Sequence, residues 1–186
     1  MLEENTRKTE DAVQKAFPNE KWYDAAALKL KNKGKEFEIP PGVKNISVAR
    51  SRLTGKKEDE RTLVKEIRQG KILADMGDVI SLLPKLRAPD GKYIKGPDAV
   101  VNGDLFEFKN ITGSIKRVER NFRKSRYQSE NVFLVIADPA ISKGDVLTKI
   151  KTVLNDPSYT GGTNGHLVFH LAQTEKTYFM RIKDLK

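Results

Sequence analysis

Three charged side chains stand in the otherwise apolar stretch of residues 97–109, PDAVVNGDLFEFK. Glu107 and Lys109 are two positions apart, so in a strand they point to the same face. Asp98 begins the preceding arm and comes near their level. Two carboxylates and a main-chain carbonyl suit Mg²⁺ or another divalent ion such as Mn²⁺. Such an ion holds a phosphate and generates hydroxide, while the lysine orients or deprotonates the water or neutralises charge developing on the phosphate.

A hairpin has to bring these side chains together. Asn102-Gly103 is the turn dipeptide expected where both central residues need positive φ. The two phenylalanines of the second arm then face the core, and Glu107 and Lys109 face solvent. The alternative is an ordinary strand with a solvated face and no catalytic role.

The surrounding elements follow an α/β order. The hydrophobic periodicity predicts helices over residues 8–33 (interrupted at Pro18), 58–77, 114–128 and 142–156, and strands over 78–84, 131–138, 166–173 and 177–185. This order predicts an α/β fold with a mixed central β-sheet flanked by helices. The loop IPPGVKN is the best boundary between a helical N-terminal extension, residues 1–40, and the main domain, residues 41–186.

The charge of the chain points to an anionic partner. The net charge is +10; residues 1–40 hold eight basic and eight acidic residues, so the excess lies in residues 41–186. A basic domain favours nucleic acid or another polyanion. No cysteine is present, which excludes disulfides, thiolate metal sites and a cysteine nucleophile. We expect no stable membrane insertion, because no run approaches ~18 apolar residues.

The segment after the hairpin is strongly basic. If residues 115–127 form a helix, Ile115, Val118 and Phe122 pack inward. The basic side chains then form an exposed track for a phosphate backbone that leads to the carboxylates. The predicted substrate-binding residues are Lys116, Arg117, Arg120, Arg123 and Lys124.

The spacing Pro-Asp, eight residues, Glu-x-Lys resembles the motif of the PD-(D/E)xK nuclease superfamily. The resemblance implies a restriction-endonuclease-like core and a metal-dependent endonuclease with Asp98, Glu107 and Lys109 in its active site. It also implies a third metal ligand on the preceding helix, for which Glu66 is the first choice and Glu60 the second.

The same resemblance implies a polar residue, commonly glutamine, on the helix after the Glu-x-Lys strand. Gln128 stands at this place and would position the lysine or the substrate.

The run GPDAVVNGDLFEFKNITGSIKRVERNFRKSRYQSENVFLVI resembles the tRNase domains at the C-termini of contact-dependent growth inhibition toxins of the CdiA type. This resemblance implies a tRNA substrate and a role in interbacterial competition. It further implies delivery as the C-terminal part of a larger secreted or surface protein, and action in the cytoplasm of a target bacterium. A cognate immunity protein would cover the site, and we expect it to present an acidic surface.

Three alternatives stay open at this point. His166 and His170 share a face of their predicted strand and could serve a metal-independent RNase. The nuclease could cut DNA in place of RNA. The chain could also be a nucleic-acid-binding module without catalytic activity.

Overall fold

The computed structural model describes all residues from Met1 to Lys186 and separates them into two compact units, Met1–Leu105 and Phe106–Lys186. Each unit contains a mixed β-sheet and two α-helices. The predicted α/β class with a mixed sheet flanked by helices is therefore confirmed, and the finer restriction-endonuclease-like assignment stays a prediction. None of the helices is long and apolar enough to cross a membrane.

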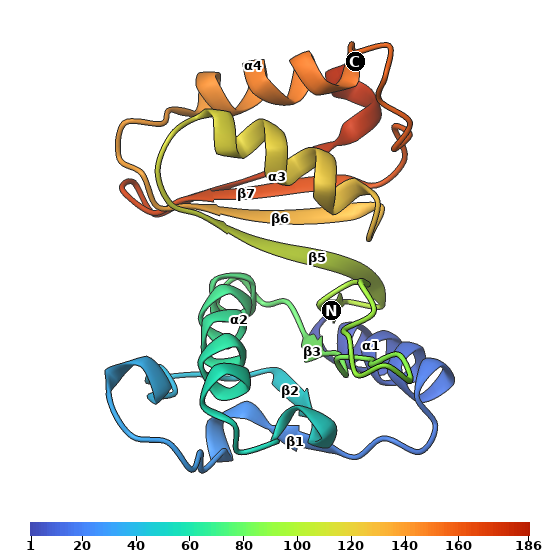
Figure 1. The fold of residues 1–186 in the computed structure, drawn as a ribbon, viewed down its shortest axis with the longest axis vertical. Helices are drawn as coiled ribbons and strands as arrows, with labels where there is room; N and C mark the ends of the chain where they lie inside the picture. Colours follow the sequence, from blue (N-terminus) through green and yellow to red (C-terminus); the bar gives the residue numbers. More distant parts are fainter. The chain divides into compact units, whose positions relative to one another are not determined.

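The first unit is built around four strands in the order β1-β2-β3-β4. Figure 1 labels β1, β2 and β3 of this unit with the helices α1 and α2. Its elements are α1 (Leu2–Ala16), β1 (Trp22–Asp24), β2 (Ile46–Ala49), α2 (Lys57–Asp75), β3 (Ile80–Leu82) and β4 (Ala99–Val101). The strands β2 and β3 are parallel, and β4 runs antiparallel to β3. The carboxyl ends of β2 and β3 consequently lie at the same edge as the amino end of β4.

The helix α2 confirms the helix predicted over residues 58–77. Leu63, Val64 and Ile67 are fully buried, as the apolar stripe of the sequence requires. Three acidic residues in its first turn lie at the positive end of the helix dipole. Gly77, at φ 99°, follows the last turn and ends the helix.

The second half of the helix predicted over residues 8–33 is not formed. The chain after α1 runs extended as β1, and Trp22 and Tyr23 pair with β2. The Asp24 side chain then accepts a 3.0 Å hydrogen bond from the amide of Ala26, which starts a single 3₁₀ turn. Strand pairing thus overrides the helix propensity of this alanine-rich segment. The division at residue 40 stays a prediction.

The turn before β5 has the predicted geometry. Asn102 and Gly103 adopt φ values of 51° and 96°, as a type I′ turn requires. Asn102 is also anchored through its side chain: Oδ1 accepts from the amide of Val79 at 2.9 Å, and Nδ2 donates to Asp78 Oδ1 at 2.6 Å. Burial raises the pKa of Asp78, partly offset by this bond. A Cβ at position 103 would lie 3.1 Å from Cβ of Lys8.

The second unit has the order β5-β6-β7-β8. Its elements are β5 (Asp104–Ile111, of which Phe106 onward belongs to this unit), α3 (Lys116–Arg126), β6 (Asn131–Ile136), α4 (Lys143–Leu154), β7 (His166–Leu171) and β8 (Lys176–Arg181). The strands β5, β6 and β7 are parallel, and β8 is antiparallel to β7. The helices and strands predicted after residue 110 are confirmed, except that the last strand ends at Arg181 and Ile182–Leu185 form a 3₁₀ helix.

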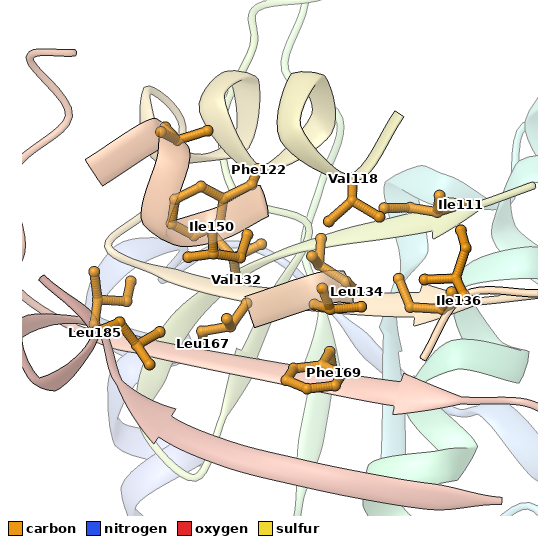
Figure 2. Packing of buried hydrophobic residues seen from close by; sticks show 14 of the residues in the cluster. Ile111, Val118, Phe122, Val132, Leu134, Ile136, Ile150, Leu167, Phe169 and Leu185 are labelled. Carbon is orange, nitrogen blue, oxygen red and sulfur yellow. The ribbon is translucent and has the colours of Figure 1, made fainter. Parts of the chain in front are cut away.

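The core of this unit lies between the helices and one face of the sheet. Figure 1 shows α3 and α4 on the same side of β6 and β7. Figure 2 shows Phe122 of α3, Ile150 of α4, and Leu134 and Phe169 of the sheet packed in one cluster. All four are fully buried. The apolar run of β6 is buried along its whole length, as expected for a strand covered on both faces.

Arg126, at the end of α3, fixes the glycine-rich loop of residues 158–165. Its Nη2 donates to the carbonyls of Gly161 and Asn164 at 3.0 and 2.8 Å, and its Nε donates to the Tyr159 hydroxyl at 3.1 Å. The guanidinium also donates to the carbonyl of Glu130. A buried arginine thus supplies the hydrogen bonds that the loop lacks from regular structure.

Candidate active site

In the second unit, three predicted site residues are in contact. Gln128, just beyond α3, donates from Nε2 to Glu107 Oε1 at 3.0 Å. The Lys109 ammonium forms an ion pair with the same Oε1 atom. The strand β5 provides the carboxylate and the ammonium from one face, and the end of α3 provides the amide. The predicted proximity of Gln128 to the Glu-x-Lys pair is present in the fold.

The expectation that Glu107 faces solvent is wrong. Only 1% of Glu107 is exposed, and 27% of the Lys109 side chain is exposed. Parallel pairing sets Glu107 beside Val132, which belongs to the core under α3 and α4. The strand is therefore covered on both faces, which simple alternation of charged and apolar residues does not reveal.

The phenylalanines of β5 lie on the opposite face, as predicted. Phe106 and Phe108 are buried. Phe108 meets Phe133 edge to face, with ring centroids 5.4 Å apart. The edge-to-face contact stabilises the strand beyond the effect of burying the two rings. It also fixes the direction in which Glu107 and Lys109 point.

In the first unit, Glu66 and Asp98 are joined by Lys85. The Lys85 ammonium lies 3.2 Å from Glu66 Oε1 and forms an ion pair with Asp98. The second carboxylate oxygen of Glu66 accepts from Arg52 Nη2 at 2.7 Å. Arg52, Glu66 and Asp98 are buried, so the cluster contains two carboxylates and two cationic groups largely removed from water.

The topology of the first unit explains this cluster. Arg52 follows β2 and Lys85 follows β3, so both leave the sheet at the shared carboxyl edge. Asp98 immediately precedes the antiparallel β4, and its carbonyl accepts from the amide of Leu83 at 2.9 Å. Glu66 reaches the same place from α2. Residues separated by up to 46 positions in the sequence are thereby gathered at one edge.

The charges in this cluster affect Lys85. Burial alone would lower the pKa of Lys85, but the carboxylates of Glu66 and Asp98 more than offset this and raise it above its usual value. Lys85 therefore carries its positive charge at neutral pH. An ammonium between two carboxylates shows that this position favours a cation.

Glu60, the second choice for a metal ligand, has another role. Its carboxylate accepts from the amides of Lys31 and Asn32 at 3.0 and 2.9 Å, and from the Asn32 side chain at 2.6 Å. Burial tends to raise the pKa of Glu60, and these hydrogen bonds lower it overall. Glu60 holds the loop before β2, so Glu66 is the remaining candidate metal ligand on α2.

The donor set suits a hard divalent cation, because carboxylate oxygens are the ligands that Mg²⁺ and Mn²⁺ prefer. The chain contains no group of three or more His, Asp or Glu side chains that could hold a metal ion. Metal binding by Glu66, Asp98 and Glu107 stays a prediction.

The basic helix is formed, and four of its five predicted binding residues are exposed: Lys116, Arg117, Arg120 and Lys124. Arg123 differs, because its Nη2 donates to Asp156 Oδ2 at 2.5 Å. Asp156 also accepts from Ser158, and these bonds together lower the pKa of Asp156 to about 2. Arg123 is thus engaged with the loop after α4 and is the least available of the five.

The two histidines lie on one face of β7, as strand alternation predicts. Each ring has a local partner: His166 Nδ1 lies 3.2 Å from Asn131 Oδ1, and His170 Nδ1 lies 2.9 Å from Thr177 Oγ1. Four residues of strand separate their Cα atoms by roughly 13 Å. Burial lowers the pKa of His170, partly offset by Glu175.

Lys85 and the role of Arg52 were not identified from the sequence. Arg52 is buried against Glu66. The only signal in the sequence is position: each residue comes within three positions of the end of an apolar segment. Without the order of strands, that signal does not distinguish them from other loop cations.

Comparison with known proteins gives one match. Residues 95–174 match the family model of the contact-dependent growth inhibition CdiA C-terminal domain. This range contains four of the five predicted catalytic residues, all but Glu66. No curated protein and no solved structure matches the chain. The family match supports a contact-dependent growth inhibition toxin domain over residues 95–174.

Proposed function

We propose that the chain is a metal-dependent nuclease toxin domain that hydrolyses phosphodiester bonds in RNA, with tRNA as its substrate. The observation that carries this proposal is the contact of Glu107 with both Lys109 and Gln128. A buried carboxylate that fixes a partly exposed lysine is the arrangement expected where an ammonium acts on a reacting phosphate. The PD-(D/E)xK resemblance names the same three residues.

The proposed metal ligands are Asp98, Glu107 and Glu66. When bound, Mg²⁺ or Mn²⁺ would supply a Lewis acid for the phosphate and lower the pKa of water. The donor chemistry of these carboxylates suits such an ion.

The chain's own groups then have separate roles. Glu107 holds Lys109 in one orientation, and the Gln128 amide donates to the same carboxylate oxygen and helps to fix it. The Lys109 ammonium donates hydrogen bonds to the attacking water or to the phosphate oxygens, where negative charge develops. The exposed residues of α3 bind the RNA backbone through its phosphates, so affinity should fall steeply with salt.

The biological role proposed here follows from the family match. The domain would be delivered as the C-terminal part of a larger secreted or surface protein, and it would act in the cytoplasm of the target bacterium. A cognate immunity protein would neutralise it in the producing cell. Its binding surface should be acidic, because the chain carries a net charge of +10.

A cleavage assay with total tRNA and plasmid DNA tests the proposal. The wild-type chain is incubated with Mg²⁺, with Mn²⁺ or with EDTA, and compared with Glu107→Gln. We expect tRNA cleavage only with a divalent ion, and a loss of about 10³-fold or more in Glu107→Gln. Glu130→Gln makes the same change at an exposed position of the same unit and should cleave normally. Circular dichroism confirms that each variant is folded.

The other outcomes are informative in the opposite direction. Cleavage that persists in EDTA would remove the metal from the mechanism and direct attention to His166 and His170. Cleavage of plasmid alone would make the domain a DNase. Binding of tRNA without cleavage under any condition would indicate a nucleic-acid-binding module.

A further inference from the structure

We infer that Lys85 is a positioning residue: it holds Glu66 and Asp98 together and gives up its place when a divalent cation binds between them. The inference rests on the proposed metal site. Its basis is the contact of the Lys85 ammonium with both carboxylates, at 3.2 Å from Glu66 and in an ion pair with Asp98. The ammonium thus stands where a cation bound by these two ligands would lie.

Repulsion between cations favours the departure of a cationic group when a metal ion enters. Arg52 pairs with Glu66, and Lys85 pairs with both Glu66 and Asp98. A divalent ion that entered between the carboxylates would lie close to both cationic side chains. This proximity is strongly unfavourable, because like charges repel more in a low-dielectric environment.

The structure indicates that Lys85 is the group that leaves. Only 4% of the Arg52 side chain is exposed, and its Nη1 is also bound to the carbonyl of Leu83 at 3.0 Å. The Lys85 side chain is 31% exposed and lies in the segment between β3 and β4. Its long flexible stem lets the ammonium move into solvent without displacing the backbone.

A purely structural ion pair would look the same in the absence of metal, so the test must measure metal affinity. Lys85→Met keeps the apolar stem and removes the competing charge. Lys85→Arg keeps the charge. Lys92→Met is the matched control, because Lys92 lies in the same segment and pairs only with the exposed Asp90. Asp98→Asn removes a proposed ligand.

Binding of Mn²⁺ to the full chain is measured by isothermal titration calorimetry. We expect Lys85→Met to bind Mn²⁺ at least about tenfold more tightly than wild type, since a unit charge roughly 4 Å away no longer competes. Lys92→Met and Lys85→Arg should stay within about twofold of wild type. Asp98→Asn should weaken binding in both the wild-type and the Lys85→Met backgrounds.

The possible failures are distinguishable. Equal or weaker Mn²⁺ binding by Lys85→Met, with binding still dependent on Asp98, would overturn the role of Lys85 and leave the metal site in place. Absence of Asp98-dependent binding in every variant would overturn the proposed metal site itself.

Thermal unfolding gives a second readout that tolerates a less stable variant. Without metal, Lys85→Met should unfold at a lower temperature than wild type, because the buried carboxylates lose a partner. Saturating Mn²⁺ should raise its Tm more than that of wild type, because the ion replaces the missing charge and binds more tightly. A Tm increase equal to that of wild type would contradict the inference.

Discussion

The two units each bury a carboxylate in contact with a lysine, but the surroundings of the two pairs differ. In the first unit, Glu66 and Asp98 share Lys85, and Arg52 also pairs with Glu66. In the second unit, Glu107 contacts Lys109 and the neutral amide of Gln128. The first arrangement places two carboxylates around the Lys85 ammonium. The second places an ammonium and an amide on one carboxylate oxygen.

We infer from this difference that the two carboxylate clusters have different roles. A pair of carboxylates around a single ammonium can accept a stronger cation in its place. A carboxylate oxygen that accepts from both an amide and the ammonium holds its lysine in a defined position, because the two hydrogen bonds limit rotation of the carboxylate. We therefore propose that metal affinity lies mainly in the first unit and phosphate chemistry mainly in the second.

Replacing Lys109 by Met should have the largest effect on this comparison. If Lys109 serves catalysis, cleavage of tRNA should fall by about 10²–10⁴-fold, while Mn²⁺ binding stays near the wild-type level. Asp98→Asn should lose both tRNA cleavage and Mn²⁺ binding. Single-turnover cleavage and calorimetry measure the two quantities on the same preparations. Parallel losses of cleavage and binding in Lys109→Met would remove the proposed separation of roles.

Replacing Arg52 by Met should have a large effect on stability. The change leaves the buried Glu66 with Lys85 as its remaining ion-pair partner, and we expect a loss of about 3 kcal/mol in the free energy of unfolding. Arg61→Met is the matched control: Arg61 bridges the more exposed Glu36 and Glu58, and the expected loss is below about 1 kcal/mol. Urea unfolding followed by circular dichroism compares them. Equal losses would show that burial of the Arg52 pair contributes nothing special.

The smallest effect concerns His170 and the pH dependence of stability. Because burial lowers the folded-state pKa of His170, the unfolded chain binds more protons below about pH 6.5, and stability falls as pH decreases through this range. His170→Asn should therefore lose less stability than wild type between about pH 7.5 and about pH 5.5. Glu175→Gln should lose more stability than wild type over the same pH range, because Glu175 raises the pKa of His170 and its removal lowers that pKa further. Urea midpoints at both pH values measure the difference.

Local signals predicted much of the fold. The Asn102-Gly103 turn, the helix over residues 58–77 and the buried strand over residues 131–138 depend on local patterns, and each is present. The failures involve pairing between distant segments. The chain at Trp22 becomes a strand because β2 is beside it, and β2 itself has no distinguishing local pattern.

The candidate site shows the same limit. The place of Gln128 near the Glu-x-Lys pair followed from the resemblance to a known motif, but the burial of Glu107 did not, because it depends on the helices packed over β5 and β6. Lys85 was missed for the same reason. Its proximity to Asp98 exists only because β3 and β4 are antiparallel neighbours.

The turn that precedes β5 also limits which residues the chain can accept at position 102. Glycine would tolerate the positive φ but would leave the amide of Val79 and the carboxyl of Asp78 without their partner. Aspartate would keep the acceptor for Val79, yet it would place a second acid against Asp78. Of the residues that tolerate this backbone conformation, asparagine is the one whose amide both accepts from Val79 and donates to Asp78. The residue at position 102 is therefore set by contacts with Asp78 and Val79, which are distant in the sequence. When the turn is randomised and stable variants are selected, asparagine should be recovered at this position.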